Sequence, residues 1–244
     1  MEKLSQSFSK EKALDPRLKW TNMPLLVDQG VTSQGRLTVG AAAESDAWKK
    51  TYYEPTIDKD NVPILGLEWK GDFSAQTRFR LNALHQFDQA GLMVRYSADC
   101  WIKTGLEYVD GKVKPNVVVT NGYSDWTTQG TREATSDATL TIHKRGNKFV
   151  IEFGPEETDS SGSWWTFLIG GDTFKPQPQY FTRSCALKPA SASQKPTVGL
   201  FVACPKKPGG TACFDYLIIK TLLKKEMPSE VDLLTSVLVS QTAS

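Results

Sequence analysis

Residues 87–126 read FDQAGLMVRYSADCWIKTGLEYVDGKVKPNVVVTNGYSDW and contain three successive strand-like segments. In residues 89–96, the side chains of Ala90, Leu92, Val94 and Tyr96 alternate with those of Gln89, Gly91, Met93 and Arg95, the period of two expected when one face of a strand is buried. The links are short: residues 97–99 form a turn, and residues 109–111, Val-Asp-Gly, favour a tight hairpin. Because a parallel return needs a crossover of about a dozen residues, the segments are predicted to be antiparallel neighbours.

The second segment has two unlike faces. One face is predicted to point between two sheets and carries Ile102, Thr104 and Leu106. The other is predicted to lie on a concave surface and carries Trp101, Lys103 and Glu107, with Gly105 leaving a gap among them. An indole, an ammonium and a carboxylate in one row are unusual for a solvated strand face.

Flat aromatic faces beside hydrogen-bonding groups are suited to a polar ring compound such as a sugar. The loop after the third segment adds further groups of this kind, and the polar-aromatic stretch around Trp48 is a candidate rim. The predicted ligand-binding residues are Trp48, Gln89, Trp101, Lys103, Glu107, Tyr123, Asp125 and Trp126. The alternative is structural: Trp101 packs under a loop, and Lys103 and Glu107 form a weak cross-strand pair.

Several motifs carry a family resemblance. DQAGLMVR, WIKTGLE and VVVTNGYSDW, together with SDAWKKTYYE, GDFSAQTRF and VGLFVACPKKPGGTACFDYL, resemble a concanavalin A-like domain-of-unknown-function family labelled "regulation of enolase". Similar sandwich modules are appended to some xylosidases. The likeness runs from about Leu18 to Ile219. It implies an all-β, concanavalin A-like jelly-roll sandwich of two antiparallel sheets, and it implies no reaction.

The chain is predicted to hold one domain, since all-β sandwiches often reach 200 to 250 residues. We expect a flexible lead-in or a single helical turn at residues 1–17, the sandwich at residues 18–222, and a tail at residues 223–244. The tail contains a short amphipathic helix by its apolar spacing. Residues 164–169, WWTFLI, are the most apolar run and are predicted to form a core strand.

Charge and composition limit the partners. Lys and Arg number 29 against 27 Asp and Glu, a net charge of +2, so no nucleic-acid partner is predicted. No membrane span and no signal-peptide core are evident, which predicts a cytoplasmic protein. The four cysteines lack metal-site spacing, so no metal and no cofactor is predicted; buried thiols are expected, with a bridge between Cys204 and Cys213 left open.

Catalytic motifs are missing from the sequence. Jelly-roll glycosidases of the concanavalin A-like type carry closely spaced carboxylates on one strand, whereas here only Glu107 lies on the predicted concave face. His85 and His143 have no motif that pairs them with a nucleophile. No catalytic residue is therefore predicted.

The sequence is compatible with three functions. The first is a non-catalytic, lectin-like module that binds a saccharide. The alternative is a cytoplasmic protein-interaction or metabolic regulatory protein with a protein partner. The third is a glycoside hydrolase or lyase with unrecognised catalytic residues.

Overall fold

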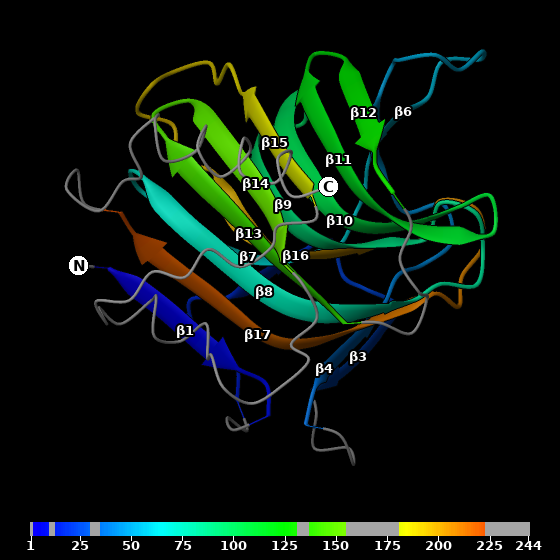
Figure 1. Ribbon diagram of the computed structural model, residues 1–244, viewed down its shortest axis with the longest axis horizontal. Helices are drawn as coiled ribbons and strands as arrows, with labels where there is room; N and C mark the ends of the chain where they lie inside the picture. Colours follow the sequence, from blue (N-terminus) through cyan, green and yellow to red (C-terminus); the bar gives the residue numbers. More distant parts are fainter. Residues whose placement is uncertain (1, 10–12, 30–34, 131–136, 155–180, 223–244) are drawn as a thin grey trace, which may run out of the picture.

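The computed structural model describes residues 2–9, 13–29, 35–130, 137–154 and 181–222. These residues form β-strands and no helix, arranged as two large antiparallel sheets packed face to face (Figure 1). The predicted all-β, two-sheet jelly-roll sandwich is therefore confirmed. The core strand predicted at residues 164–169 and the helix predicted in the tail lie outside the described residues.

Within this part of the chain, the larger sheet has eight strands in the order β15-β14-β13-β8-β17-β4-β3, with β1 also paired to β17. Their bounds are β1 (Lys3–Ser7), β3 (Leu26–Gln29), β4 (Leu37–Gly40), β8 (Phe73–Asn82), β13 (Ala138–Arg145), β14 (Lys148–Gly154), β15 (Phe181–Ala186) and β17 (Thr211–Thr221). The long strands β8 and β17 run side by side through its centre (Figure 1).

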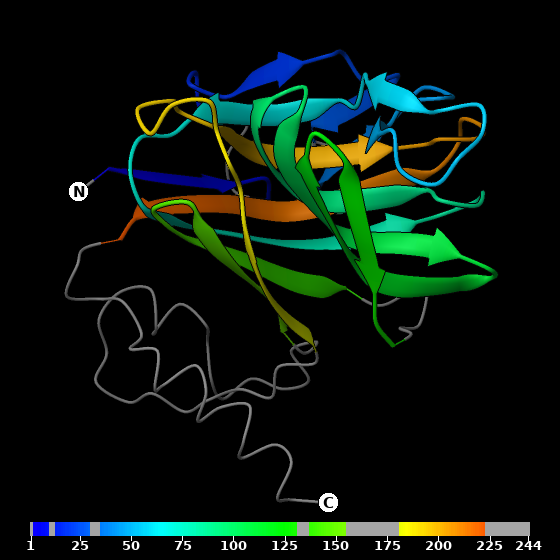
Figure 2. The same ribbon diagram turned by 90° about the horizontal axis from the view of Figure 1, so that it is seen from above.

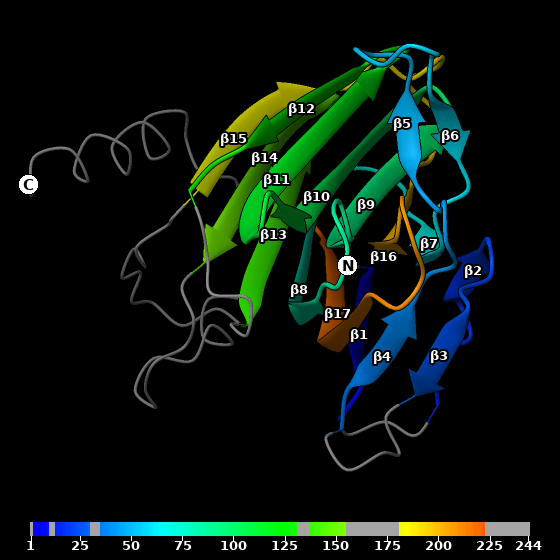
Figure 3. The ribbon, with the colours of Figure 1, turned by 90° about the vertical axis from the view of Figure 1, so that its right-hand side faces the viewer.

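The second sheet has seven strands among the described residues, in the order β12-β11-β10-β9-β16-β7-β2. Their bounds are β2 (Lys19–Thr21), β7 (Ile64–Glu68), β9 (Gln89–Ser97), β10 (Cys100–Val109), β11 (Lys112–Asn121), β12 (Ser124–Thr128) and β16 (Thr197–Ala203). A separate hairpin, β5 (Ala47–Lys49) with β6 (Asp58–Asp60), lies near β9, β16 and β7 (Figure 3).

The register of β10 is as predicted. Ile102 and Leu106 are buried in the main core cluster, together with residues of the larger sheet such as Leu140 and Phe214. Trp101 belongs to a different cluster on the other side of the sheet. The row containing Trp101, Lys103 and Glu107 therefore lies on the outer face of the seven-stranded sheet, away from the core between the sheets.

Two local features hold β10 in this register. The β10–β11 link is a two-residue turn in which Asp110 and Gly111 have φ of 51° and 79°, the left-handed pair that suits the twist of a hairpin. On the other side, Gly105 lies opposite Gly91 of β9. A Cβ atom at Gly105 would lie 1.8 Å from the carbonyl oxygen of Ala90, so only glycine fits there.

The expected lead-in at residues 1–17 is wrong for Lys3–Ser7, which forms β1 alongside β17 (Figure 2). The first half of β17 pairs with β4, and its second half, from Tyr216 to Lys220, pairs with β1. Leu4 is fully buried in the main core. A polar segment with few apolar residues gave no strand signal by itself, and its conformation is decided by the edge that β17 offers.

Tyr123 to Trp126 were expected in a loop, and this is wrong from Ser124 onward. Residues Ser124–Thr128 form β12, the edge strand, and Trp126 lies opposite Val118 of β11. The loop reduces to the turn at Gly122 and Tyr123, where Gly122 has φ of 80°. The edge of β11 supplies backbone partners that the polar sequence alone did not indicate.

Candidate functional site

A pocket of about 130 Å³ opens on the outer face of the seven-stranded sheet, between that sheet and the β5–β6 segment. Five of the predicted residues line it: Trp48, Gln89, Lys103, Glu107 and Trp126. Four of them come from β9, β10 and β12 of that sheet, whose antiparallel order brings them together, and Trp48 comes from β5 of the separate hairpin. Trp126 is 41% exposed, whereas Lys103 and Glu107 are almost fully buried at 1% and 4%.

Glu107 is the most constrained group in the pocket. Its Oε1 accepts a hydrogen bond from Gln89 Nε2 at 3.3 Å. Its Oε2 accepts from Asn116 Nδ2 at 3.2 Å and from Trp126 Nε1 at 2.8 Å. Burial raises the pKa of Glu107 to about 7, although the charge of Lys103 and the hydrogen bonds from Trp126 and Asn116 act in the opposite direction. Glu107 therefore changes its charge near neutral pH.

Lys103 is held by a carboxylate from outside the sheet. Its ammonium donates to Oδ1 of Asp46, which directly precedes β5. The same contact joins the sheet to the β5–β6 segment. A buried ammonium needs such a partner, because taking an unpaired charge out of water is costly.

Gln89, which lines the pocket, carries an unpaired acceptor. Its Nε2 donates both to Glu107 and to the carbonyl oxygen of Phe87, at 3.1 Å, and this fixes the orientation of the amide. Its buried Oε1 has no hydrogen-bond partner among the described residues. Buried polar atoms are satisfied in most structures, so an orphan beside a pocket indicates a place where a ligand could donate a hydrogen bond.

The wall at Phe87 has an unusual backbone. Phe87 has φ of 70°, a conformation that is uncommon for a bulky residue. It is held by Phe87 N donating to the carbonyl oxygen of Tyr108 at 2.7 Å. Beside it, Asp88 Oδ2 accepts from the backbone N–H groups of Leu84 and His85, each at 2.9 Å. Strain of this kind is often found at binding sites, where the surrounding structure imposes it.

Aromatic rings form much of the remaining surface. Trp48 and Tyr53 pack edge to face with centroids 5.8 Å apart, and both line the pocket. Trp48 Nε1 donates to the carbonyl oxygen of Thr51 at 3.0 Å, which fixes its ring. Together with the partly exposed Trp126, these rings give the pocket flat apolar faces next to charged groups.

Three predicted residues lie outside this pocket. Trp101 is fully buried under the β5–β6 segment, in a cluster with Ala47 and Val62. Tyr123 is 66% exposed in the β11–β12 turn, with Lys50 Nζ 5.9 Å from its ring centroid. Asp125 is exposed and pairs with Arg183 at 2.9 Å.

Sequence reasoning missed other residues that line the pocket, and those with polar or aromatic side chains are Asp46, Tyr53, Lys59, Phe87 and Lys206. Most of them lie in turns or short strands with no periodic pattern. Asp46 and Tyr53 stand in the SDAWKKTYYE motif, which offered a signal through the family resemblance. The position of Lys206, after β16, depends on how the sandwich closes.

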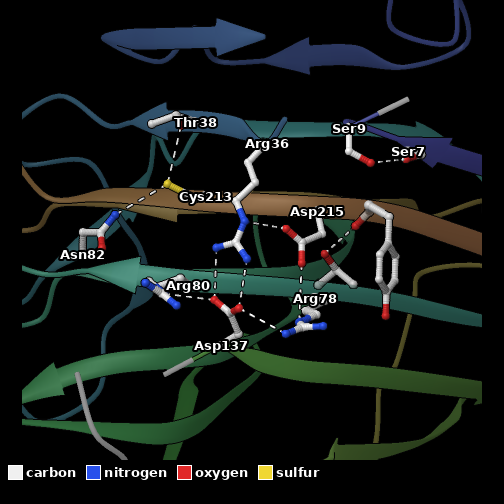
Figure 4. Close-up of polar contacts among 12 residues, drawn as sticks. Ser7, Ser9, Arg36, Thr38, Arg78, Arg80, Asn82, Asp137, Cys213 and Asp215 are labelled. Carbon is white, nitrogen blue, oxygen red and sulfur yellow. Dashed lines mark hydrogen bonds and ion pairs between the residues drawn. The ribbon is translucent and has the colours of Figure 1, made fainter. Parts of the chain in front are cut away.

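A second polar cluster lies on the outer face of the larger sheet (Figure 4). Asp137 accepts from Arg36 at 2.9 Å, from Arg80 at 3.0 Å and from Arg78 at 3.2 Å, and Arg36 also pairs with Asp215 at 2.7 Å. Burial alone would raise the pKa of Asp137, but the Arg36 hydrogen bonds and the three arginine charges hold it below its ordinary value. The carboxylates and guanidinium groups in this cluster form ion pairs with one another, which is typical of a structural network.

The described residues contain no group of three His, Cys, Asp or Glu side chains that could hold a metal ion. In the same part of the chain, no helix is long and apolar enough to cross a membrane. All four cysteines are free, so Cys204 and Cys213 are not bridged.

Comparison with known proteins agrees with this fold. The chain is 38% identical over 109 residues to "Regulation of enolase protein 1" of Saccharomyces cerevisiae, a stretch that covers 45% of this chain and 52% of that protein. The chain thus spans about half the length of this curated relative. A crystal structure described as that of a functionally unknown protein from Saccharomyces cerevisiae superposes with a TM-score of 0.67 at 25% identity, covering 85% of this chain and 97% of the other.

A Bacteroides ovatus protein, "Xyloglucan PUL GH43B", shares the fold with a TM-score of 0.61 at 13% identity, over 89% of this chain and 39% of that protein. The model of the family "Protein of unknown function (DUF1349)" matches residues 20–222, which include the whole sandwich except β1 and part of β2. The chain therefore belongs to this family.

Proposed function

We propose that the pocket binds a saccharide and does not cleave it. The observation that carries the proposal is the pair Trp126 and Glu107: a partly exposed indole is fixed by its own N–H, at 2.8 Å, to a buried carboxylate. Such a ring is ordered before a ligand arrives, so stacking a sugar on it costs little conformational freedom. The unpaired Oε1 of Gln89, a residue that lines the pocket, is the acceptor that we assign to a hydroxyl group.

The arrangement of carboxylates favours binding over cleavage. The pKa of Glu107, about 7, is in the range of a general acid. Glycoside hydrolysis, however, ordinarily uses two carboxylates that act together. The second carboxylate that lines this pocket, Asp46, is already paired with Lys103. A hydrolase or lyase is therefore the weaker proposal.

The test is a thermal-shift screen followed by calorimetry, with glucose, galactose, xylose, glucuronate and galacturonate as probes. A saccharide that binds only the folded protein must raise its melting temperature, and at 100 times its Kd it adds about 2.7 kcal/mol. Replacing Trp126 with Ala is expected to weaken binding by about fivefold or more, since an aromatic face contributes on the order of 1 kcal/mol.

Tyr123→Ala is the matched control, because Tyr123 is an exposed aromatic residue of the same β11–β12 hairpin but does not line the pocket. The binding proposal fails if no probe raises the melting temperature, or if both variants lower the affinity equally. Turnover of a glycoside that Glu107→Gln abolishes without weakening binding would instead make the protein an enzyme.

The second candidate is a regulatory protein that binds another protein. It is favoured by the 38% identity to a relative named for the regulation of enolase. Exposed apolar side chains, such as Tyr52 at 89% and Leu84 at 63%, offer contact surface outside the pocket. Sedimentation velocity of the purified protein mixed with purified enolase tests it: a new faster-sedimenting species supports this candidate, and additive profiles reject it.

A further inference from the structure

The charges that line the pocket are unequal. Three lysines face two carboxylates there: Lys59, Lys103 and Lys206 against Asp46 and Glu107. Lys103 and Asp46 neutralise each other. The remaining two lysines share the pocket with one further carboxylate, Glu107, whose pKa burial raises to about 7.

These two lysines have weak partners. Lys206 Nζ lies 5.8 Å from the ring centroid of Phe87 and forms no ion pair with the other described residues. Lys59 Nζ lies 3.8 Å from the carboxylate of Glu44, whose side chain is 77% exposed. Its better contact is with the backbone carbonyl oxygen of Glu44, at 3.0 Å. Each ammonium group thus keeps N–H donors that a ligand can use.

We propose, on the basis of the saccharide function above, that the ligand is an anionic saccharide whose carboxylate or phosphate group is bound by Lys59 and Lys206. Its hydroxyl groups then face Gln89 and the indole of Trp126. A carboxylate and a phosphate present the same chemistry to these two lysines, namely negatively charged oxygen acceptors.

The charges around Glu107 make the binding dependent on pH. The charged and titratable groups around Glu107 are Lys103 on its own strand, Lys114 directly across on β11, Asp46 before β5, Tyr53 after β5, Lys59 on β6 and Lys206 after β16. A bound anion disfavours the charged form of Glu107, so protonation of Glu107 favours anion binding. The affinity for glucuronate, whose carboxylate stays ionised in this range, is expected to rise several-fold between pH 8 and pH 6 in the wild type and to stay flat in Glu107→Gln.

Calorimetry with glucose, glucuronate and glucose 6-phosphate tests the inference. Glucuronate or the phosphate ester is expected to bind about tenfold more tightly than glucose, since a hydrogen bond to a charged group contributes about 1.5 kcal/mol or more. Which of the two binds better identifies the anionic group. Lys206→Ala is expected to remove most of that difference, while Lys207→Ala, at the neighbouring lysine that does not line the pocket, keeps it.

Two outcomes overturn the inference and leave the saccharide function standing: glucose binds as tightly as both anions, or Lys206→Ala weakens glucose and glucuronate alike. A pocket that binds none of the three probes also overturns it, and the wider panel above then decides the saccharide function. Inorganic phosphate is the last probe. If it binds as tightly as glucose 6-phosphate, the anion site stands and the saccharide is not recognised.

Discussion

The indole Nε1 of Trp126 lies 2.8 Å from Oε2 of Glu107, although the two residues belong to strands that are separated by β11. The hydrogen bond crosses over the middle strand, where Asn116 donates to the same oxygen at 3.2 Å. One carboxylate thus aligns side chains from three neighbouring strands. The ionisation of Glu107 and the position of the indole are coupled through this contact.

Replacing Trp126 with Phe keeps a ring at the pocket but removes this donor. Because the donor stabilises the charged carboxylate, the pKa of Glu107 is expected to rise above its value of about 7. Carbon NMR of labelled glutamate side chains measures it. Tyr123→Phe on the same hairpin serves as the control, and an unchanged pKa in Trp126→Phe would show that the contact is not formed in solution.

The stability of the protein should depend on the ionisation of Glu107. Its folded-state pKa, about 7, lies above the ordinary 4.5, so the folded protein retains a proton that the unfolded chain releases. Stability is therefore lost as the pH rises from about 4.5 to 7, by on the order of 3 kcal/mol, and stays at the lower level above that.

Urea unfolding at pH 5, 6, 7 and 8 compares the wild type with Glu107→Gln, which cannot ionise at this position. The free energy of unfolding of the wild type is expected to fall relative to the variant across this range. A constant difference between the two proteins would refute the raised pKa.

Trp101 is predicted to be a structural residue. It is fully buried with Met93, Val118 and Phe201, and its Nε1 donates to the carbonyl oxygen of Ala98 at 3.1 Å. Trp101→Ala should lower the free energy of unfolding by about 3 kcal/mol or more. Tyr123→Ala should change it by less than about 0.5 kcal/mol, because that ring is exposed. Equal melting temperatures for the two variants would contradict this assignment.

Gly105 is predicted to tolerate no side chain. The clash of a Cβ atom at Gly105 is with the backbone of Ala90 and Gly91, which cannot move without separating β9 from β10. Gly105→Ala is expected to lower the melting temperature sharply and to reduce soluble yield. A Cβ atom at Gly111, in the adjacent hairpin turn, would meet no atom within 4 Å. Gly111→Ser should therefore lower the melting temperature only through the strain of its positive φ. A Gly105→Ala protein as stable as the wild type would show that the strands can separate locally.

The strand periodicity was sufficient to predict the meander from β9 to β11 and the faces of β10. Ile102 and Trp101 point to opposite sides as their alternation requires, because a shift of one residue would invert every side chain. Short links then left the antiparallel order as the only one available. β1 could not be found in this way, because its conformation depends on a partner more than 200 residues away.

The site was predictable only in part, and the reason is the β5–β6 segment. Lys103 and Glu107 share one face of β10, so their proximity follows from the strand pattern, whereas Trp126 joins them through β12, which was not predicted. Whether that face is open or covered depends on where the segment before β7 folds. This segment covers Trp101 and leaves Trp126 partly exposed. The alternation of side chains along β10 cannot predict which of the two indoles is covered.

The β5–β6 hairpin also gives the two walls of the pocket different thermodynamic character. One wall is the seven-stranded sheet, whose opening would disrupt the whole sandwich. The other is a two-stranded ribbon, attached to that sheet through a small apolar cluster, the contact from Asp46 to Lys103, and the ion pairs from Arg95 to Asp60 and from Lys49 to Asp99. Two-stranded ribbons are marginally stable alone, so the position of this wall depends on its side-chain contacts with the sheet. Variants that remove these ion pairs are therefore expected to loosen this wall while the sandwich stays folded.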